Sequence, residues 1–356
     1  MYRILLLFFL FFGTGCSPSD EALPERPSDT PSARTVAVDA SFYPQIAAAG
    51  VRYFDAHGNE TDFLDLLRSH GVNTVRLRLW VDPATEHSGL TEVRDFSQSL
   101  RDRGFQTWLT LHYSDTWADP GQQQTPARWR GLELSELSDS VRAYTERVVR
   151  DLQPDLVQIG NEINSGLLHP TGNLSQNPAN FRTLLETAAA AVRTAAPDCQ
   201  IMVHYAGLDA DWWLDQINGL DYDLIGLSYY PLWHGKSLDS LEHSVRRLGD
   251  AYGKDVLIAE TSYPFTLDWS DQTHNVVGLE EHLVLPDFPA TPKGQRDFIR
   301  AVRQRLEHTE RGAGFCYWGG EWIARRGATT TDGSSWENQA LFDFEHRALP
   351  ALDAFR

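Results

Sequence analysis

Short apolar runs alternate with amphipathic segments along most of this chain, and this alternation constrains its fold more than any other feature. Eight runs have the length and character of buried strands: residues 35–40, 73–80, 107–113, 156–161, 201–205, 224–228, 256–260 and 314–318. Apolar residues recur at helical spacing between them, in residues 60–70, 91–103, 134–152, 180–196, 212–219, 238–253 and 294–308. Eight strand–helix units in series predict an α/β protein: a single-domain (β/α)8 TIM barrel over residues 35–356.

An open, doubly wound sheet is the other fold that such units can form. That fold carries a glycine-rich phosphate loop after its first strand. The first run here continues as Val36-Ala-Val-Asp-Ala-Ser41, which contains no glycine. The barrel is therefore the favoured prediction.

The first residues have the pattern of an export signal. An apolar run at residues 4–12 is too short to cross a bilayer as a helix, and it leads to Gly13-Thr-Gly-Cys16. This ending resembles a bacterial lipoprotein signal, so we expect a signal peptide at residues 1–15 and a lipid on Cys16. The lipid would anchor the exported protein at the bacterial outer membrane or cell surface; ordinary signal-peptidase cleavage is the alternative. Residues 16–34 are rich in proline, serine and acids, which predicts a flexible tether.

The charge of the chain narrows the class of partner. Acidic residues outnumber basic ones by 49 to 31, which gives a formal net charge of −18. A field of that sign repels phosphate backbones, so we expect no nucleic-acid partner, whereas a neutral polysaccharide is compatible. Cys199 and Cys316 lie in apolar surroundings at predicted strands, which favours two buried free thiols over a disulfide between them. We expect a monomer.

Polar and aromatic side chains gather where the predicted strands end. In a barrel these ends open onto one mouth, where barrel enzymes hold their catalytic residues. The residues of this kind are Arg76, His112, Tyr113, Asp115, Asn161, Glu162, His204, Tyr229, Glu260 and Trp318. Each has a structural alternative: an arginine can pair with an outer helix, a histidine can be satisfied in the core, and a glutamate can be a solvated loop residue.

Glu162 and Glu260 each close an apolar run, in the strings Ile-Gly-Asn-Glu and Leu-Ile-Ala-Glu-Thr. Two carboxyl groups at one barrel mouth suggest the paired acids of a retaining glycosidase, in which one protonates the leaving oxygen and the other attacks the anomeric carbon. Asn161 suits a hydrogen bond to a sugar 2-hydroxyl, and Glu260 can accept hydrogen bonds from Arg76 and Tyr229. We therefore assign Glu162 as acid/base and Glu260 as nucleophile, in a reaction that needs no metal.

Longer motifs occur in a fixed order around these positions. They are Gly71-Val-Asn-Thr-Val-Arg-Leu-Arg-Leu-Trp80, Leu111-His-Tyr-Ser-Asp-Thr-Trp-Ala-Asp-Pro-Gly121, Val157-Gln-Ile-Gly-Asn-Glu-Ile-Asn164, Ile225-Gly-Leu-Ser-Tyr-Tyr-Pro-Leu-Trp-His-Gly235, Ala259-Glu-Thr-Ser-Tyr-Pro264 and Trp336-Glu-Asn-Gln-Ala-Leu-Phe-Asp-Phe344. With these motifs, residues 35–356 resemble the arabinogalactan endo-β-1,4-galactanases of glycoside hydrolase family 53, a retaining (β/α)8-barrel family of clan A.

The resemblance implies an endo-acting hydrolase that cleaves β-1,4-galactosidic bonds in galactan, the type I arabinogalactan side chains of pectin, through a covalent glycosyl-enzyme. It implies Glu162 as proton donor and Glu260 as nucleophile. The substrate-binding residues that it implies are Arg76, His112, Tyr113, Asp115, Trp117, Asn161, His204, Tyr229, Trp233 and Trp318. Tyr230 is expected to pack instead, because neighbours on a strand point to opposite sides.

The chain departs from the family pattern in the loops after two strands. Tyr317-Trp318 is followed by Gly319-Gly-Glu-Trp322 where relatives often have Glu-Pro. After the seventh strand, Asp268, Asp271 and Asn275 lie where some bacterial relatives hold calcium. The resemblance implies no required cofactor and leaves a structural calcium ion open at this loop.

Two other functions remain open at this point. One is a retaining endo-glycanase of the same clan that acts on another β-1,4 polymer, such as mannan or glucan. The other is a non-catalytic barrel that binds glycans at the cell surface, which would keep the aromatic residues and lose the acids. Measurable turnover would exclude the non-catalytic, glycan-binding barrel.

Overall fold

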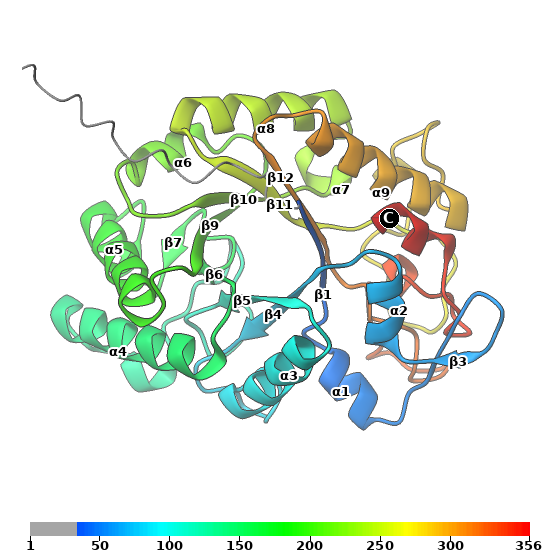
Figure 1. Ribbon diagram of the computed structural model, residues 1–356, viewed down its shortest axis with the longest axis horizontal. Coiled ribbons are helices and arrows are strands. Elements are labelled where there is room, and N and C mark those ends of the chain that lie inside the picture. The colour runs from blue at the N-terminus through cyan, green and yellow to red at the C-terminus, as the bar shows by residue number, and fades with distance from the viewer. Residues whose placement is uncertain (1–33) are drawn as a thin grey trace, which may run out of the picture. The chain divides into compact units, whose positions relative to one another are not determined.

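The computed structural model describes residues 34–356, and its central feature is a closed barrel of eight parallel strands (Figure 1). The strands are β1 (Thr35–Asp39), β4 (Thr74–Leu79), β5 (Gln106–Leu111), β6 (Leu156–Ile159), β9 (Gln200–Ala206), β10 (Leu224–Ser228), β11 (Asp255–Thr261) and β12 (Gly312–Tyr317). Strand β1 pairs with both β12 and β4, which closes the barrel. The predicted TIM barrel is confirmed, with each strand in its predicted region.

Helices cover the outside of the barrel between successive strands (Figure 1). They are α1 (Tyr43–Ala48), α2 (Phe63–Ser69), α3 (Leu90–Asp102), α4 (Leu134–Leu152), α5 (Pro178–Ala195), α6 (Asp211–Gln216), α7 (Pro231–His234), α8 (Leu238–Tyr252) and α9 (Pro292–Glu307). The helix predicted at residues 60–70 begins later than expected. Asp62 caps α2, because its carboxylate accepts a hydrogen bond from the N–H of Asp65.

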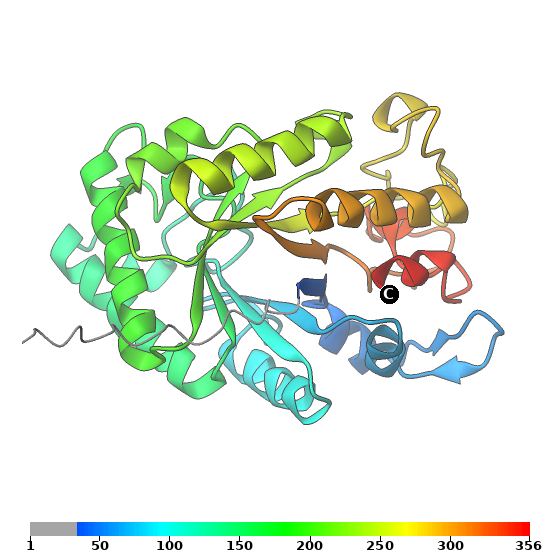
Figure 2. The same cartoon turned by 45° about the horizontal axis from the view of Figure 1, so that its top comes forward.

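Several short elements lie outside the strand–helix series. They are the hairpin of β2 (Tyr53–Phe54) and β3 (Glu60–Thr61), the hairpin of β7 (Gly166–Leu167) and β8 (Gly172–Asn173), and 3-10 helices at Ala127–Trp129, Glu280–His282, Glu337–Gln339 and Pro350–Phe355. The β2–β3 hairpin lies beside the C-terminal segment (Figure 2), where the N–H of Phe54 donates to the carbonyl of His346 at 3.0 Å. The 3-10 helix at Pro350–Phe355 packs against α9 in the place where an eighth helix would follow β12.

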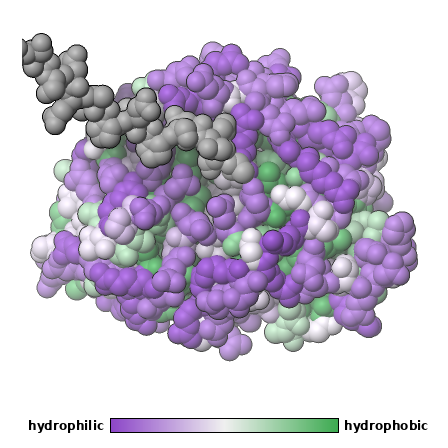
Figure 3. Space-filling view, in the orientation of Figure 1, coloured by the Kyte–Doolittle hydropathy of each residue, from purple (hydrophilic) through white to green (hydrophobic). Residues whose placement is uncertain are grey.

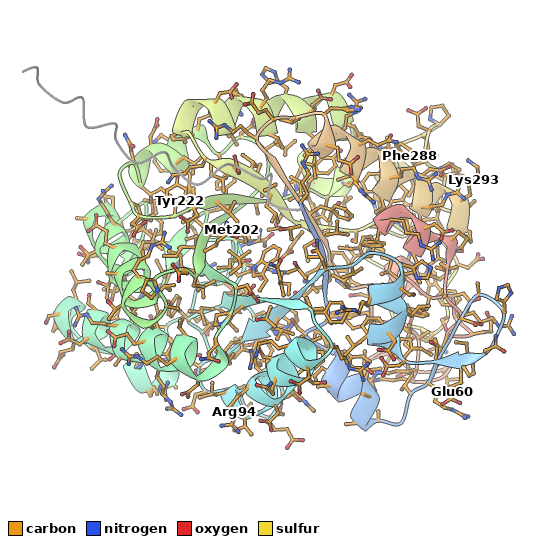
Figure 4. The ribbon with its side chains drawn as sticks, in the orientation of Figure 1. Glu60, Arg94, Met202, Tyr222, Phe288 and Lys293 are labelled. Carbon is orange, nitrogen blue, oxygen red and sulfur yellow. The ribbon has the colours of Figure 1, made fainter. Side chains whose placement is uncertain are left out.

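Side chains on the strands alternate between two buried clusters. One cluster lies inside the barrel and contains Ala37, Trp108, Leu156, Met202, Leu224, Leu257, Ala259 and Cys316. The other fills the space between strands and helices, and it contains the intervening residues such as Ile225, Leu227 and Ile258. Figure 4 places Met202 inside the ring of strands, while Glu60, Arg94 and Lys293 lie at the periphery. A Cβ at Gly226 would lie 2.8 Å from the Met202 sulfur, so a larger residue there would require the Met202 side chain to move.

One face of the barrel is mostly polar (Figure 3), and the two cysteines of the barrel are buried. The face seen in Figure 1 is mostly hydrophilic, with apolar residues in small separate areas (Figure 3). Cys199 and Cys316 are both free and buried, as predicted. Within residues 34–356, no helix has the length and apolar character needed to cross a membrane. The predicted signal peptide (residues 1–15) and tether (residues 16–34) lie outside the described residues, apart from Arg34, and stay predictions.

Candidate active site

The C-terminal ends of the strands open into a cavity of about 570 Å³. Several residues selected from the sequence line it: Trp117, Asn161, Glu162, Trp233, Glu260 and Trp318. Sequence reasoning missed others that also line it: Asp119, Tyr230, His234, Trp322 and Trp336. The structure therefore brings together two carboxyl groups and a wall of indole rings at one mouth of the barrel.

Arg76 lies behind the lining of this cavity and binds two of the residues that line it, Asn161 and Glu260. Its guanidinium contacts Glu260 at 2.8 Å and Asp39 at 3.0 Å, and it donates to the Asn161 side-chain oxygen at 2.7 Å. Arg76 is 2 % exposed, so these carboxylates compensate a fully buried charge. Asp39 ends the first strand, and its role is not among the predictions from the sequence, which cover the ends of the other seven strands.

Glu260 reaches the cavity because β11 is irregular. Leu257 and Ala259 point into the barrel and Ile258 points outward, so a regular strand would turn Glu260 outward as well. The ladder to β10 skips a residue here: Leu227 pairs with Ile258, and Ser228 pairs with Glu260. This β-bulge at Ala259 turns the Glu260 carboxylate inward. Bulges beside functional sites often redirect a side chain in this way.

A second irregularity presents Glu162 to the same cavity. Glu162 has a positive φ of 46°, which is uncommon for a residue with a side chain. The chain turns just before it at Gly160, where φ is 84° and a Cβ would lie 2.5 Å from the side chain of Ile163. The Ser228 hydroxyl donates to the Glu162 carboxylate at 2.5 Å and fixes its orientation.

His204 connects the two sides of the floor beneath Glu162. Its Nε2 lies 3.0 Å from the Ser228 hydroxyl, which itself donates to Glu162. Its Nδ1 accepts from the side-chain amide of Gln158 at 2.9 Å and from the backbone N–H of Glu162 at 3.3 Å. These partners assign the proton to Nε2. Burial and the Arg76 charge hold the pKa of His204 well below its usual value, so the ring is neutral.

The two carboxyl groups have different electrostatic environments. Burial, reinforced by the negative charge of Glu260, raises the pKa of Glu162 to about 8. Burial also raises the pKa of Glu260, but the guanidinium of Arg76 and the hydroxyl of Tyr230 oppose it. Because the cation touches Glu260 directly, Glu260 ionises first and Glu162 keeps its proton near neutral pH. Such a pair provides one proton donor and one carboxylate nucleophile.

Comparison with known proteins agrees with this arrangement. The model of glycosyl hydrolase family 53 matches residues 35–355. An arabinogalactan endo-beta-1,4-galactanase of Cellvibrio japonicus is 37% identical over 343 residues, which covers 90% of each chain. The chain belongs to glycosyl hydrolase family 53. It is accordingly a glycoside hydrolase.

Solved structures of the family have the same fold. The GH53 catalytic domain of Ignisphaera aggregans superposes with a TM-score of 0.85 at 39% identity, covering 94% of this chain and 97% of that one. A structure described as one of two fungal beta-1,4-galactanases gives a TM-score of 0.78 at 32% identity, covering 91% of this chain and 99% of that one. The barrel is thus the family-53 barrel over nearly its whole length.

The structure exchanges the roles expected for Tyr229 and Tyr230. The Tyr230 hydroxyl donates to Glu260 at 2.9 Å, whereas Tyr229 stacks on Phe298 of α9 and its hydroxyl has no partner among residues 34–356. The expected bond from Tyr229 to Glu260, and its place among the substrate-binding residues, are therefore wrong. Alternation along β10 explains this, since Leu224, Gly226, Ser228 and Tyr230 all point inward. Continuing that alternation past Ser228 would have predicted it.

Tyr113 and Asp115 also lie away from the cavity. Tyr113 points outward, and its hydroxyl pairs with the Thr145 hydroxyl of α4 at 2.7 Å. Asp115 accepts from the N–H of Ala127 at 2.7 Å and holds the 3-10 helix at Ala127–Trp129. The expectation that Tyr113 and Asp115 bind substrate is therefore wrong. His112 does point inward, where its Nδ1 accepts from the N–H of Ala118 and fixes the loop that carries Trp117.

Indole rings form one wall of the cavity. Trp318 lies 4.5 Å from Trp336 and 4.8 Å from Trp322 between ring centroids, and Trp117 lies 6.3 Å from Trp318. Trp233, 55 % exposed, stands 6.1 Å from Trp336 at the rim. Trp336 occurs in a motif that resembles the family, and Trp322 occurs in a loop that departs from it, so only Trp336 had a sequence signal.

Three side chains at the mouth of the barrel are of the types that bind metal ions. Glu162, His204 and Glu260 each offer one ligand atom, and these atoms lie within 4.8 Å of one another. Both ring nitrogens of His204 already take part in hydrogen bonds, and Arg76 occupies one oxygen of Glu260. The positive charge of Arg76 beside Glu260 repels a metal cation, so these three side chains suit acid–base chemistry better than metal binding.

The loop after β11, together with Glu337, offers oxygen atoms of the kind that calcium binds. The side-chain oxygen of Asn275 and one oxygen of Glu337 are buried and have no hydrogen-bond partner within residues 34–356. Asp271 is buried beside Glu337, while the side chain of Asp268 is exposed. Carboxylate and amide oxygens suit calcium. Calcium at Asp268, Asp271 and Asn275 stays a prediction, and Glu337 fits such a site better than Asp268.

Replacing Ser228 with alanine is expected to move the alkaline limb of kcat/KM to higher pH by about one unit. The Ser228 hydroxyl stabilises the ionised form of Glu162 and so lowers its pKa, and a hydrogen bond to a charged group contributes ~1.5 kcal/mol. Without it, Glu162 keeps its proton to higher pH. The pH profile of kcat/KM measures this shift. Ser262→Ala, which removes a buried serine bonded to Gln339, is the control, and an unmoved or lowered limb in Ser228→Ala would contradict the assignment.

Replacing Tyr230 with phenylalanine is expected to lower kcat by about 10- to 100-fold. The lost hydroxyl orients Glu260 and donates to its carboxylate, and a displaced reactive group costs rate steeply. Tyr229→Phe is the matched control, because its hydroxyl has no partner in the described structure, and kcat should stay within about twofold. Equal losses in both variants would show that packing, and not the bond to Glu260, decides the effect.

Proposed function

We propose that this chain is an endo-acting β-1,4-galactanase that cleaves internal galactosidic bonds of galactan, including the type I arabinogalactan side chains of pectin. The names of its family-53 relatives support this substrate. The single observation that carries the proposal is the pair of carboxyl groups at the mouth, one held by Arg76 and Tyr230 and the other with a pKa raised to about 8.

The proposed reaction has two steps and retains the anomeric configuration. Glu260 attacks the anomeric carbon while Glu162 gives its proton to the departing glycosidic oxygen, which leaves a covalent galactosyl-enzyme. Glu162, now ionised, takes a proton from water, and the resulting hydroxide displaces Glu260 from the sugar. No metal or cofactor takes part in either step.

The separation of the two acids supports retention over inversion. One oxygen of Glu162 and one of Glu260 lie within 4.8 Å of each other. Retaining enzymes hold their carboxyl groups ~5–5.5 Å apart, while inverting enzymes need ~6.5–9.5 Å to admit a water molecule. The close approach of these two oxygens is compatible with direct attack by Glu260.

The remaining groups suit a neutral sugar chain. Asn161 uses one amide N–H on the carbonyl of Ala118 at 2.9 Å and has a second for a sugar 2-hydroxyl. The indole wall offers apolar faces to pyranose rings. Export and anchoring through a lipid on Cys16 belong to the same proposal, since a pectin side chain is met outside the cell.

Turnover on a panel of linear β-1,4-galactan, mannan, xylan and cellulose tests the substrate. We expect galacto-oligosaccharides of mixed length early in the reaction and no comparable rate on the other polymers. Proton NMR of the first products tests the mechanism, with the β-anomer expected first. Faster cleavage of mannan or glucan would favour the rival glycanase, an α-anomer would show inversion, and absent turnover on all four would favour a binding protein.

A further inference from the structure

Arg78 is a buried cation that the reaction described above does not use. It lies two residues after Arg76 on β4, points inward like Arg76, and is 4 % exposed. Its guanidinium donates two hydrogen bonds to the Ser88 hydroxyl, at 3.1 and 2.8 Å. Within residues 34–356 no carboxylate lies within 4.0 Å of its guanidinium. A buried charge without an ion-pair partner needs another source of stabilisation.

Three aromatic rings supply that stabilisation. The guanidinium carbon lies 4.4 Å from the ring centroid of Phe42, 4.4 Å from that of Trp80 and 4.1 Å from that of Trp117. All three distances are well inside the range of cation–π attraction. We call Arg78, Phe42, Trp80 and Trp117 the Arg78 cage. Its rings come from the loop after β1, the end of β4 and the loop after β5, so the cation joins three separate segments.

Trp117 links this cage to the catalytic cavity. One side of its indole contacts the guanidinium, and the same residue lines the cavity beside Trp318 and Trp322. Trp117 lies in a loop without helix or strand, so no backbone ladder fixes the angle of its ring. The guanidinium carbon of Arg78, at 4.1 Å, lies nearer to the Trp117 ring centroid than does the centroid of any neighbouring aromatic ring in residues 34–356, the nearest of which is 5.7 Å away.

We propose that Arg78 is a positioning residue: its guanidinium sets the angle of Trp117 and thereby the affinity of the cavity for the sugar chain. This inference rests on the proposed function for the identity of the ligand. It assigns Arg78 to substrate affinity, and leaves the bond-breaking step to Glu162, Glu260 and Arg76. Planarity matters here, because a flat guanidinium can lie against several rings at once and a compact ammonium cannot.

Arg78→Met and Arg78→Lys separate stacking from charge. Methionine keeps an unbranched apolar stem and removes a charge that has no carboxylate partner, so the barrel should still fold. We expect Arg78→Met to raise KM for linear galactan about tenfold, with kcat within about twofold. Lysine keeps the charge but not the plane, and KM should stay raised severalfold. A full return to wild-type KM in Arg78→Lys would overturn the proposal in favour of a purely electrostatic role.

A double-mutant cycle with Trp117→Phe tests whether Arg78 acts through Trp117. If it does, Arg78→Met should raise KM little further once Trp117 has been replaced, and independent effects that multiply would contradict the proposal. Near-UV circular dichroism of the ligand-free variants gives a second readout that needs no substrate. The tryptophan signal should change in Arg78→Met, and an unchanged spectrum would also contradict it.

Controls separate this proposal from general instability and from the assigned function. Arg193→Met breaks the surface pairs with Asp221 and Asp223, and should leave KM and the tryptophan signal unchanged. Phe42→Leu removes one ring of the cage, and its KM should rise by less than in Arg78→Met, so it serves as the test if Arg78→Met does not fold. If the wild-type protein cleaves no galactan, the proposed function fails, while the spectroscopic comparison still tests the cage.

Discussion

Replacing Glu260 with alanine should lower the rate of galactan hydrolysis by roughly 10⁵-fold, the scale seen when a covalent nucleophile is removed. Without this carboxylate no galactosyl-enzyme forms, and the cavity keeps only its binding contacts and the proton donor. Added azide should restore part of the rate on an aryl β-galactobioside with a good leaving group. Azide would enter from the side that Glu260 occupies, so the product should be the α-galactosyl azide, identified by NMR.

The structure supplies controls for this experiment. Glu242 is a glutamate on the outer face of α8, paired with Arg246 and Arg305, and its replacement by alanine should leave kcat unchanged. Glu260→Ala also removes one partner of Arg76, so its thermal unfolding must be recorded, and Glu260→Gln provides an isosteric second variant. Normal hydrolysis by either folded Glu260 variant would exclude Glu260 as the nucleophile.

Replacing Glu162 with glutamine should lower hydrolysis of galactan by about 10²- to 10⁴-fold, because the galactosyl leaving group needs a proton. An aryl β-galactobioside with a dinitrophenol leaving group does not need that proton, so the rate of its first step should change little. The pH profile should change as well. The carboxyl of Glu162, with a pKa of about 8, is an effective donor below that pH and is lost as the pH rises through it. The alkaline limb of the wild-type enzyme near pH 8 should therefore disappear in Glu162→Gln with the activated substrate.

Azide distinguishes the two acids by stereochemistry. In Glu162→Ala the galactosyl-enzyme still forms on Glu260, and azide then attacks from the opposite face to give the β-galactosyl azide. The two alanine variants thus predict opposite anomers from one substrate. The same anomer from both variants, or an alkaline limb that persists in Glu162→Gln, would show that the roles have been assigned incorrectly.

The sequence predicted the barrel well because its strands are buried on both faces. Such strands are continuous apolar runs, and their ends locate the mouth without knowledge of any contact. Arg76, Glu162 and Glu260 were identified because each ends or lies in such a run. Asp39 ends a run too, but nothing in its local sequence indicates that it shares a guanidinium with Glu260.

The direction of individual side chains was harder to predict. Tyr113 and Tyr229 were placed at the mouth because they follow strands, yet alternation turns both outward, and Tyr230 takes the expected place beside Glu260. For Tyr230 the alternation was readable from the sequence. For Glu260, alternation alone predicts an outward side chain. The bulge at Ala259 turns the side chain inward instead, and a bulge leaves no signature in a short apolar run. Trp322 was missed since its loop departs from the family pattern.

The bulge at Ala259 also limits how this barrel can change during evolution or design. Straightening β11 at its present length, so that Ala259 instead of Glu260 paired with Ser228, would give a more regular ladder with β10, the kind of repair that selection for stability or an idealised backbone favours. The same repair would rotate Glu260 toward the helices and leave Arg76 facing the cavity with Asp39 as its carboxylate partner. The inward direction of Glu260 therefore depends on the extra residue that β11 carries at Ala259, and a redesigned strand without the bulge would lose this carboxylate from the cavity.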